Sequence, residues 1–435
     1  MRILKNWTGV VPWIIGLIIV WTIANVSLKN DYKTGVIQSD ARGYYAYLPA
    51  VFIYKDLNFR FFYTIEREKY YDANYYYQYL RVHNNKTINK YYAGTALCLV
   101  PFYIIGHVVT LLTNYPADGY SYYYTLFTHI GALFYLLIGL FGLRKLLRTF
   151  LIDEKKIALV LIAFVFGTNL FYYVLSEFAM SHVYSFALIS WFSYSVRKYF
   201  MEQQSKYFIF SMLLLGVITL IRPLNLIVLF SLPFLAGSRY ELNEGFKLLL
   251  KRPFVLFLGI IGFAILVFVQ LLIYKISTGD FIVYSYQEEG FNFLSPQIWN
   301  FLVSYRKGMF LYTPLLLISV TGFYFMFRSN RYQAISLFAF LLLLVYVLSS
   351  WHMWYYGGSF SQRVMIDFFA FFAILLSTAW MEIRNRQVGR IFTILILLAI
   401  VFCQIQTYQY RRMQIHWSDM DKGKYWEVFM RVDKL

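Results

Sequence analysis

Apolar runs of about twenty residues recur along the whole chain, and this repetition constrains the fold more than any other feature. A backbone inside lipid must satisfy its own hydrogen bonds, so each run is predicted to be a helix rather than a barrel strand. Only 14% of the residues are charged, well below the roughly 25% of soluble domains. The sequence therefore predicts an all-α integral membrane protein.

The basic residues lie in short clusters between the apolar runs, although the formal net charge is +18. This pattern is typical of membrane orientation and argues against a nucleic-acid-binding face. Placing Arg2 and Lys5 in the cytoplasm makes the runs alternate in direction, as about eleven spans. The predicted spans are 7–28, 122–143, 157–175, 183–196, 207–220, 224–235, 254–274, 309–327, 334–348, 364–381 and 391–408.

In this arrangement the longer polar segments fall on the non-cytoplasmic side. They include an outer loop, 29–121, with juxtamembrane helices, and a short outer C-terminal tail, 409–435. The apolar segment 94–112 would break the charge alternation, so we predict a juxtamembrane or re-entrant helix there. The run 7–28 is predicted to be a retained signal anchor. We expect one transmembrane domain over 1–435, without a soluble domain.

Metal and disulfide chemistry have little support in the sequence. The two cysteines, Cys98 and Cys403, lie in separate apolar stretches. No histidine pair has the spacing of a metal site. The sequence thus requires no cofactor, and a divalent metal is unsupported.

The stretch "SDARGYYAYLPA" places Asp40 and Arg42, a substrate-binding candidate, beside several tyrosines just after the first apolar run. A carboxylate there faces a bilayer edge where lipid headgroups pass, but Ser39 or Asp40 could equally cap the helix that follows. The segment 44–63 has the apolar and basic mix of a helix lying in the membrane interface. Tyr44 and Tyr45 are either part of an aromatic belt or sugar-stacking residues.

Four spaced motifs resemble a known family, the GT-C superfamily of polytopic glycosyltransferases, and in particular its bacterial branch. They are "SDARGYYAYLPAVF", "YYAGTALCLVPFYIIGH", "SYRKGMFLYTPLLL" and "WHMWYYGGSFSQR", and the resemblance covers most of the chain. Ser361 stands where a glycine is expected before the last Gln-Arg pair. The His-Pro-Pro stretch of protein O-mannosyltransferases and the Trp-Trp-Asp motif of oligosaccharyltransferases are missing.

The resemblance implies a GT-C-like helical bundle and an inverting transfer of sugar from a polyprenyl-phosphate-linked donor. Asp40 occupies the position of the catalytic base. The acceptor class stays open among lipid, glycan and protein. The implied location is a bacterial cytoplasmic membrane, in contact with its lipids, with the active face periplasmic or extracellular.

Three polar residues near the ends of predicted spans are further candidates. Glu177 is a second catalytic candidate that would bind an acceptor or a metal, unless it only reaches to water. His182 is a substrate-binding candidate, and its alternative role is to hydrogen-bond a backbone group. Arg222 is always charged and needs a carboxylate or phosphate partner, so it either binds substrate or forms an ion pair inside the bundle.

The late outer loops supply the remaining substrate-binding candidates. Arg306, Lys307 and Arg363 would stabilise the phosphate of a leaving lipid, or else bind headgroups. Arg363 ranks first because it lies in a family-like motif, followed by Arg306. His352 and Trp354 lie in the same tryptophan-rich motif, where a lone histidine is more often packed than a ligand.

Two other functions fit a polytopic bundle with basic sites. A transporter or flippase of lipid-linked substrates would show repeated halves and charges midway through spans, and neither is clear here. A noncatalytic GT-C-like scaffold would use Asp40 only as a helix cap. Sugar transfer by an Asp40→Asn variant distinguishes the scaffold from the enzyme.

Overall fold

The computed structural model describes residues 9–26, 37–70 and 79–433. Within this part the chain is largely helical, as predicted, and its sheet is an antiparallel pair of short strands, β1 (Leu80–His83) and β2 (Lys86–Asn89). The charge markers Arg2 and Lys5 lie outside the described residues. So do the two ends of the first predicted span and parts of the first outer loop.

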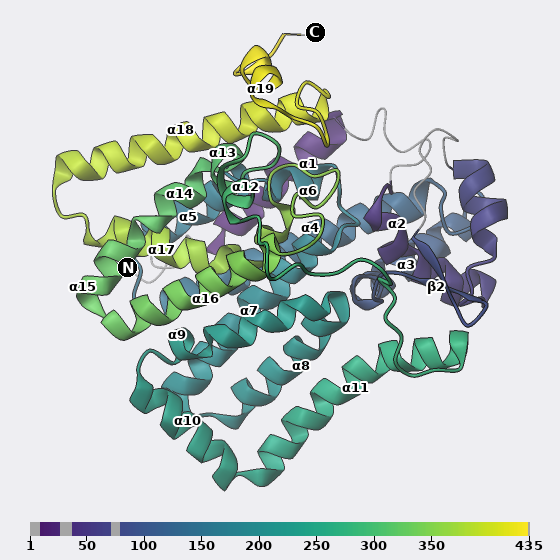
Figure 1. The fold of residues 1–435 in the computed structure, drawn as a ribbon, viewed down its shortest axis with the longest axis horizontal. Helices are drawn as coiled ribbons and strands as arrows, with labels where there is room; N and C mark the ends of the chain where they lie inside the picture. Colours follow the sequence, from purple (N-terminus) through teal and green to yellow (C-terminus); the bar gives the residue numbers. More distant parts are fainter. Residues whose placement is uncertain (1–8, 27–36, 71–78, 434–435) are drawn as a thin grey trace.

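The helices follow one another along the whole described chain (Figure 1). The first half contains α1 (Val11–Val26), α2 (Asp40–Pro49), η3 (Ala50–Tyr54), η4 (Phe62–Tyr70), α3 (Gly94–Leu111), α4 (Tyr122–Arg148), α5 (Glu154–Phe166), α6 (Leu170–Leu175), α7 (Ser181–Glu202) and α8 (Ser205–Ile221). The second half contains η5 (Pro223–Ser231), α9 (Leu232–Ala236), α10 (Arg239–Lys251), α11 (Pro253–Thr278), α12 (Ile298–Val303), α13 (Met309–Tyr312), α14 (Pro314–Val320), α15 (Gly322–Ser329), α16 (Arg331–Ser349), η6 (Arg363–Phe368), α17 (Phe369–Glu382), α18 (Arg386–Arg411) and α19 (Lys422–Val428).

Six helical segments in the described part are long and apolar enough to cross a membrane. They are Gly94–Leu111, Tyr122–Arg148, Pro253–Thr278, Arg331–Ser349, Arg363–Glu382 and Arg386–Arg411. The predicted count of about eleven spans is not reached by this measure, because several predicted spans are shorter or broken helices. The segment Gly94–Leu111, which was expected to be juxtamembrane or re-entrant, is one continuous helix of 18 residues. It has the length and composition of a span.

Two predicted spans are interrupted by local chemistry. Span 157–175 divides into α5 and α6 at Gly167, where the Thr168 hydroxyl bonds back to the carbonyl of Phe164. The Asn169 amide then donates to the carbonyl of Phe360 at 2.9 Å. Span 309–327 divides into α13, α14 and α15, and the first break precedes Pro314, which disfavours helical geometry in the residue before it.

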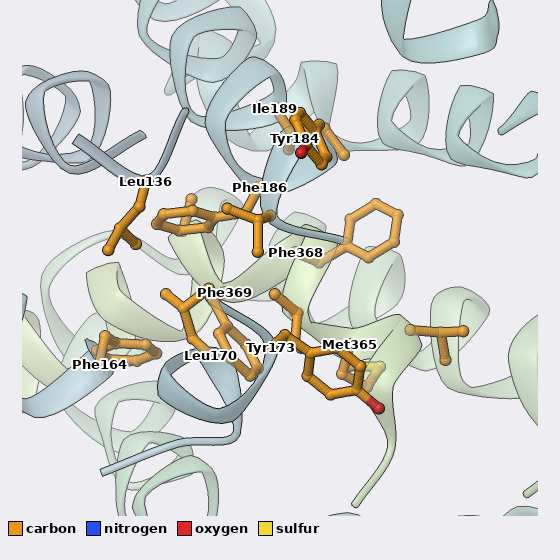
Figure 2. Packing of buried hydrophobic residues seen from close by; sticks show 14 of the residues in the cluster. Leu136, Phe164, Leu170, Tyr173, Tyr184, Phe186, Ile189, Met365, Phe368 and Phe369 are labelled. Carbon is orange, nitrogen blue, oxygen red and sulfur yellow. The ribbon is translucent and has the colours of Figure 1, made fainter. Parts of the chain in front are cut away.

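The centre of the bundle is α7, which lies beside α4 and α8 (Figure 1). It also packs against η6. Almost every residue in its first four turns is buried. Figure 2 shows Phe186 of α7 near Leu136 of α4 and above Phe369, where η6 leads into α17. Because α7 and η6 begin at the same end of this packed core, the residues at their starts are brought together.

The helix predicted to lie in the membrane interface is instead enclosed by protein. Every residue of α2 from Ala41 to Pro49 is buried, so this helix has no lipid-facing side of its own. Pro49 lies within the helical path, and the chain continues into the wider turns of η3. The amphipathic prediction for 44–63 is therefore wrong for α2, since outer-loop residues such as Tyr79 and Tyr91 cover it.

Gly94 marks a close backbone contact next to the site described below. A Cβ added there would lie 2.2 Å from the backbone nitrogen of Ile221, the residue before Arg222. We expect Gly94→Ala to lower the free energy of unfolding by about 2 kcal/mol because the two backbones must separate. The measurement is thermal unfolding of the purified protein in detergent.

The matched control is Gly389→Ala within α18. A Cβ at Gly389 has its nearest neighbour at 3.8 Å, so alanine fits and favours the helix by about 0.5 kcal/mol. Equal stability of the two variants would contradict the close contact at Gly94.

Candidate active site

A cavity of about 1100 Å³ lies where the starts of α2, α7 and η6 and the end of α8 meet. Its lining contains three carboxylates, those of Asp40, Glu177 and Glu289. Six cationic side chains also line it: Arg42, Arg81, Lys90, Arg222, Arg363 and Arg411. The excess of cations favours an anionic ligand.

Asp40 and Arg363 form an ion pair at this cavity, although they lie 323 residues apart in the chain. The other carboxylate oxygen, Oδ1, accepts a hydrogen bond of 2.7 Å from the Tyr91 hydroxyl. Ser39, at the N-cap position, makes no side-chain capping bond. Asp40 begins α2, and its carboxylate joins the first and the last of the family-like motifs.

A second polar cluster centres on Asp367, whose side chain is completely buried in η6. Its Oδ1 lies 2.8 Å from Nδ1 of His182, at the start of α7. Its Oδ2 accepts bonds from Nη1 of Arg222 at 3.3 Å and from the amide of Asn225 at 2.9 Å. Both His182 and Arg222 line the cavity, whereas Asp367 does not, so Asp367 hydrogen-bonds two cavity residues from within the core.

Glu177 lies in the loop between α6 and α7, where it is partly buried and lines the cavity. It accepts a bond of 3.1 Å from the Tyr172 hydroxyl. Burial raises the pKa of Glu177 from 4.5 to about 7, against the opposing effect of the Arg363 charge. A carboxyl that titrates near neutral pH is suited to exchange a proton during a reaction.

This raised pKa predicts a pH effect on stability. The folded protein binds the Glu177 proton more tightly than the unfolded chain, so the free energy of unfolding falls as the pH rises from 4.5 to about 7. Over this pH range the free energy of unfolding of the wild type should fall by about 2 kcal/mol, and in Glu177→Gln this fall should be absent. The value is smaller than the full linkage value because water in the cavity screens the carboxylate. Thermal unfolding across this pH range provides the measurement. Identical pH profiles for the two proteins would contradict it.

Outer-loop ion pairs form another part of the cavity wall. Glu289 accepts from Arg81 at 3.1 Å and pairs with Lys90. Arg81 belongs to β1, and Lys90 follows β2, so the strand pair is tied to the late outer loop. These contacts place the strand pair at the wall of the cavity.

The structure brings together eight of the twelve predicted site residues in the cavity lining. They are Asp40, Arg42, Tyr44, Glu177, His182, Arg222, His352 and Arg363. For Arg222 the ion pair and the substrate site are compatible, since it pairs with Asp367 and still faces the cavity. His352 packs on the ring of Trp351, with ring centres 4.7 Å apart.

The other four predicted residues lie outside this lining. Tyr45 is buried and donates to the carbonyl of Gly119. Arg306 pairs with Asp419 of the C-terminal tail at 3.0 Å. Lys307 is buried against the carbonyl of Ser359, and burial lowers its pKa to about 7. Trp354 packs edge-on against Tyr355.

Sequence reasoning missed Asp367, Tyr91 and Glu289. Asp367 carried a usable signal, because an ionisable residue inside a predicted span, here 364–381, marks a functional site by default. Tyr91 and Glu289 carried none, since tyrosines abound in this chain and Glu289 lies in a polar loop. As for metals, the described residues contain no group of three or more His, Cys, Asp or Glu side chains that could hold an ion.

No family model and no curated protein matches the chain. Solved structures do. The crystal structure of the Archaeoglobus fulgidus oligosaccharyltransferase in its apo form has a TM-score of 0.52 and 12% identity, and the match covers 99% of this chain and 60% of that one. The same archaeon's oligosaccharyltransferase AglB, in complex with an inhibitory peptide and a dolichol-phosphate, has a TM-score of 0.51 and 11% identity over 99% and 60%.

A third structure, the Archaeoglobus fulgidus enzyme tethered to an acceptor peptide containing the NVT sequon, has a TM-score of 0.50 and 10% identity over 99% and 59%. The chain thus spans about three fifths of the length of these solved structures. At this identity the likeness concerns the fold. This chain has a fold similar to that of the solved oligosaccharyltransferases, which agrees with the kind of fold that the sequence resemblance implied.

Proposed function

We propose that this chain, as a multi-pass membrane protein with a GT-C fold, is an inverting glycosyltransferase that uses a polyprenyl-phosphate-linked sugar. The observation that carries the proposal is the meeting of Asp40 and Arg363 at a cavity rich in cations. A carboxylate and an arginine side by side are the pair needed for an acceptor proton and a donor phosphate. The GT-C fold of the solved oligosaccharyltransferases supports this class of reaction.

The proposed reaction begins when the donor phosphate draws Arg363 away from Asp40. The freed carboxylate accepts the proton of an acceptor hydroxyl or amine. The acceptor atom attacks the anomeric carbon from the face opposite the phosphate, while the bond from that carbon to the phosphate oxygen breaks. The bonding electrons leave with the lipid phosphate, whose growing charge Arg363 stabilises. One displacement inverts the anomeric centre, and the proton remains on Asp40.

Most of the cavity lining comes from the loops predicted to be outer. This supports a reaction on the non-cytoplasmic face of a membrane, as in a bacterial inner membrane facing the periplasm. The solved relatives include complexes with dolichol-phosphate and with peptides. They support a lipid-linked donor here and make a peptide one acceptor to test, beside lipids and glycans.

The experiment that tests this function measures sugar transfer from labelled polyprenyl-phosphate donors to a membrane extract by the purified full-length protein. We expect transfer with inversion, determined from the anomeric configuration of donor and product by NMR. Arg306→Gln should transfer at a rate close to that of the wild type, because Arg306 lies outside the cavity lining. Transfer with retention, or no transfer from any donor, would contradict the proposal.

A further inference from the structure

The cluster around Asp367 is buried, but two of its members, His182 and Arg222, also line the cavity and could bind an anion there. Asp367 accepts from two unambiguous donors at Oδ2, Arg222 and Asn225, which is the arrangement of an ionised carboxylate. An ionised carboxylate has only acceptors, so the bond at Oδ1 requires the proton of His182 to lie on Nδ1. The carboxylate therefore fixes both the orientation and the tautomer of the imidazole.

This arrangement leaves Nε2 of His182 available to a ligand. The side chain is 4% exposed and lines the cavity. No residue in the described part of the chain hydrogen-bonds to Nε2. Arg222 is 16% exposed, lines the same cavity, and uses Nη1 for Asp367. The imidazole of His182 and the guanidinium of Arg222 thus line the same cavity, and both are hydrogen-bonded to Asp367.

The charges around His182 determine what this space can bind. Asp367 and Arg363 approach it from η6, and Arg222 approaches from the end of α8. The Tyr173 ring packs edge-on at 5.5 Å. The two arginines disfavour an imidazolium in the empty cavity, whereas an added anion would favour it. A phosphate oxygen next to Nε2 needs a donor, so binding there requires a second proton on the ring.

We propose that Asp367 is a positioning residue that assembles Arg222 and His182 into a subsite for the phosphate of the donor lipid. His182 takes up one proton from solvent at Nε2 when the phosphate binds, and Asp367 and the phosphate then flank the imidazolium. The subsite rests on the proposed function, because that function supplies the phosphate. The subsite adds to Arg363 a second group of phosphate ligands, whose positions are fixed by the buried Asp367.

The experiment measures binding of polyprenyl monophosphate, with uncharged polyprenol as the comparison, to the full-length protein in detergent. Asp367→Asn should weaken phosphate-lipid binding by at least about tenfold, since two cavity donors lose their shared counter-ion. Asn225→Ala is the matched control. It removes another Asp367 hydrogen bond, but Asn225 does not line the cavity, so the affinity should stay within about threefold.

Proton uptake has its own readouts. Polyprenyl phosphate and the carboxyl of Glu177 also titrate near neutral pH, so the useful quantity is the difference between wild type and His182→Gln. Between about pH 6 and about pH 8 the wild-type affinity should fall more steeply than that of the variant, by up to tenfold per pH unit. In ¹⁵N NMR, the histidine signal that is lost in His182→Gln should change from a neutral ring to an imidazolium on binding.

These results separate the subsite from the proposed function. Equal affinity of Asp367→Asn and wild type, equal pH dependence of His182→Gln and wild type, or preference for neither lipid would overturn the subsite. If Asp367→Asn does not fold, the His182→Gln comparison still decides. Binding of polyprenyl phosphate with the expected pH dependence, but with no sugar transfer, would reject the glycosyltransferase and leave the subsite in place.

Discussion

Asp40→Asn is expected to abolish sugar transfer and, at the same time, to bind polyprenyl phosphate more tightly than the wild type. Loss of a general base lowers the rate by about 10²- to 10⁴-fold. In the wild type the donor phosphate must compete with Asp40 for Arg363. Asparagine removes that competitor and one negative charge, so affinity should rise on the order of tenfold. Transfer assays and equilibrium binding of the phosphate lipid measure the two effects.

The opposite directions of these effects make the prediction specific. A variant that is merely misfolded loses both activity and binding. Asp419→Asn is the matched control, because it breaks an aspartate–arginine pair outside the cavity lining and should change neither property. If Asp40→Asn transfers sugar normally, Asp40 is not the base and Glu177 is the next residue to test.

Arg363→Gln is expected to lose both donor binding and transfer. The guanidinium is the cation paired with Asp40, and its removal should weaken binding of the phosphate lipid by about 10²-fold and transfer by about 10²- to 10³-fold. Asp40 would also lose its counter-ion, which should lower the free energy of unfolding by about 2 kcal/mol, less than for a fully buried pair because Asp40 is 19% exposed. Binding, transfer and thermal unfolding of the same preparation give all three values.

The double variant Asp40→Asn/Arg363→Gln separates the two roles of Arg363. Stability should return toward that of the wild type because no unpaired carboxylate remains, while transfer stays absent. Arg306→Gln provides the control for loss of an arginine outside the cavity. Normal phosphate-lipid binding by Arg363→Gln would contradict the role of this residue in donor binding.

The sequence predicted the helical class, and it predicted that most site residues share one side of the membrane, for physical reasons. Hydropathy identifies apolar helices because every backbone polar group inside lipid must be hydrogen-bonded within the protein, which favours long apolar helices. Charge alternation placed the starts of α2, α7 and η6 on one side, and the structure brings these three ends to one cavity. Helix breaks such as the one at Gly167 depend on distant partners, here the Phe360 carbonyl bonded to Asn169, so local pattern does not reveal them.

Pairings within the site were beyond sequence reasoning for the same reason. Asp40 and Arg363 were each singled out, but no local pattern indicates that they touch. Arg306 and Lys307 lie outside the cavity lining, and the sequence could not indicate this because an arginine or lysine in a loop has the same local pattern whether it faces a cavity or the C-terminal tail. Asp367 was readable as an acidic residue in an apolar run, yet its three partners come from α7 and from the turn after α8.

Asp40 leaves the ribosome 323 residues before Arg363 does. At ordinary translation speeds this interval is on the order of half a minute. Throughout that time the first helices are already inserted, but the carboxylate lacks its arginine and the cavity lacks its last wall. Completion of the final helices is therefore the step that assembles the Asp40–Arg363 pair and the rest of the cavity wall during biogenesis.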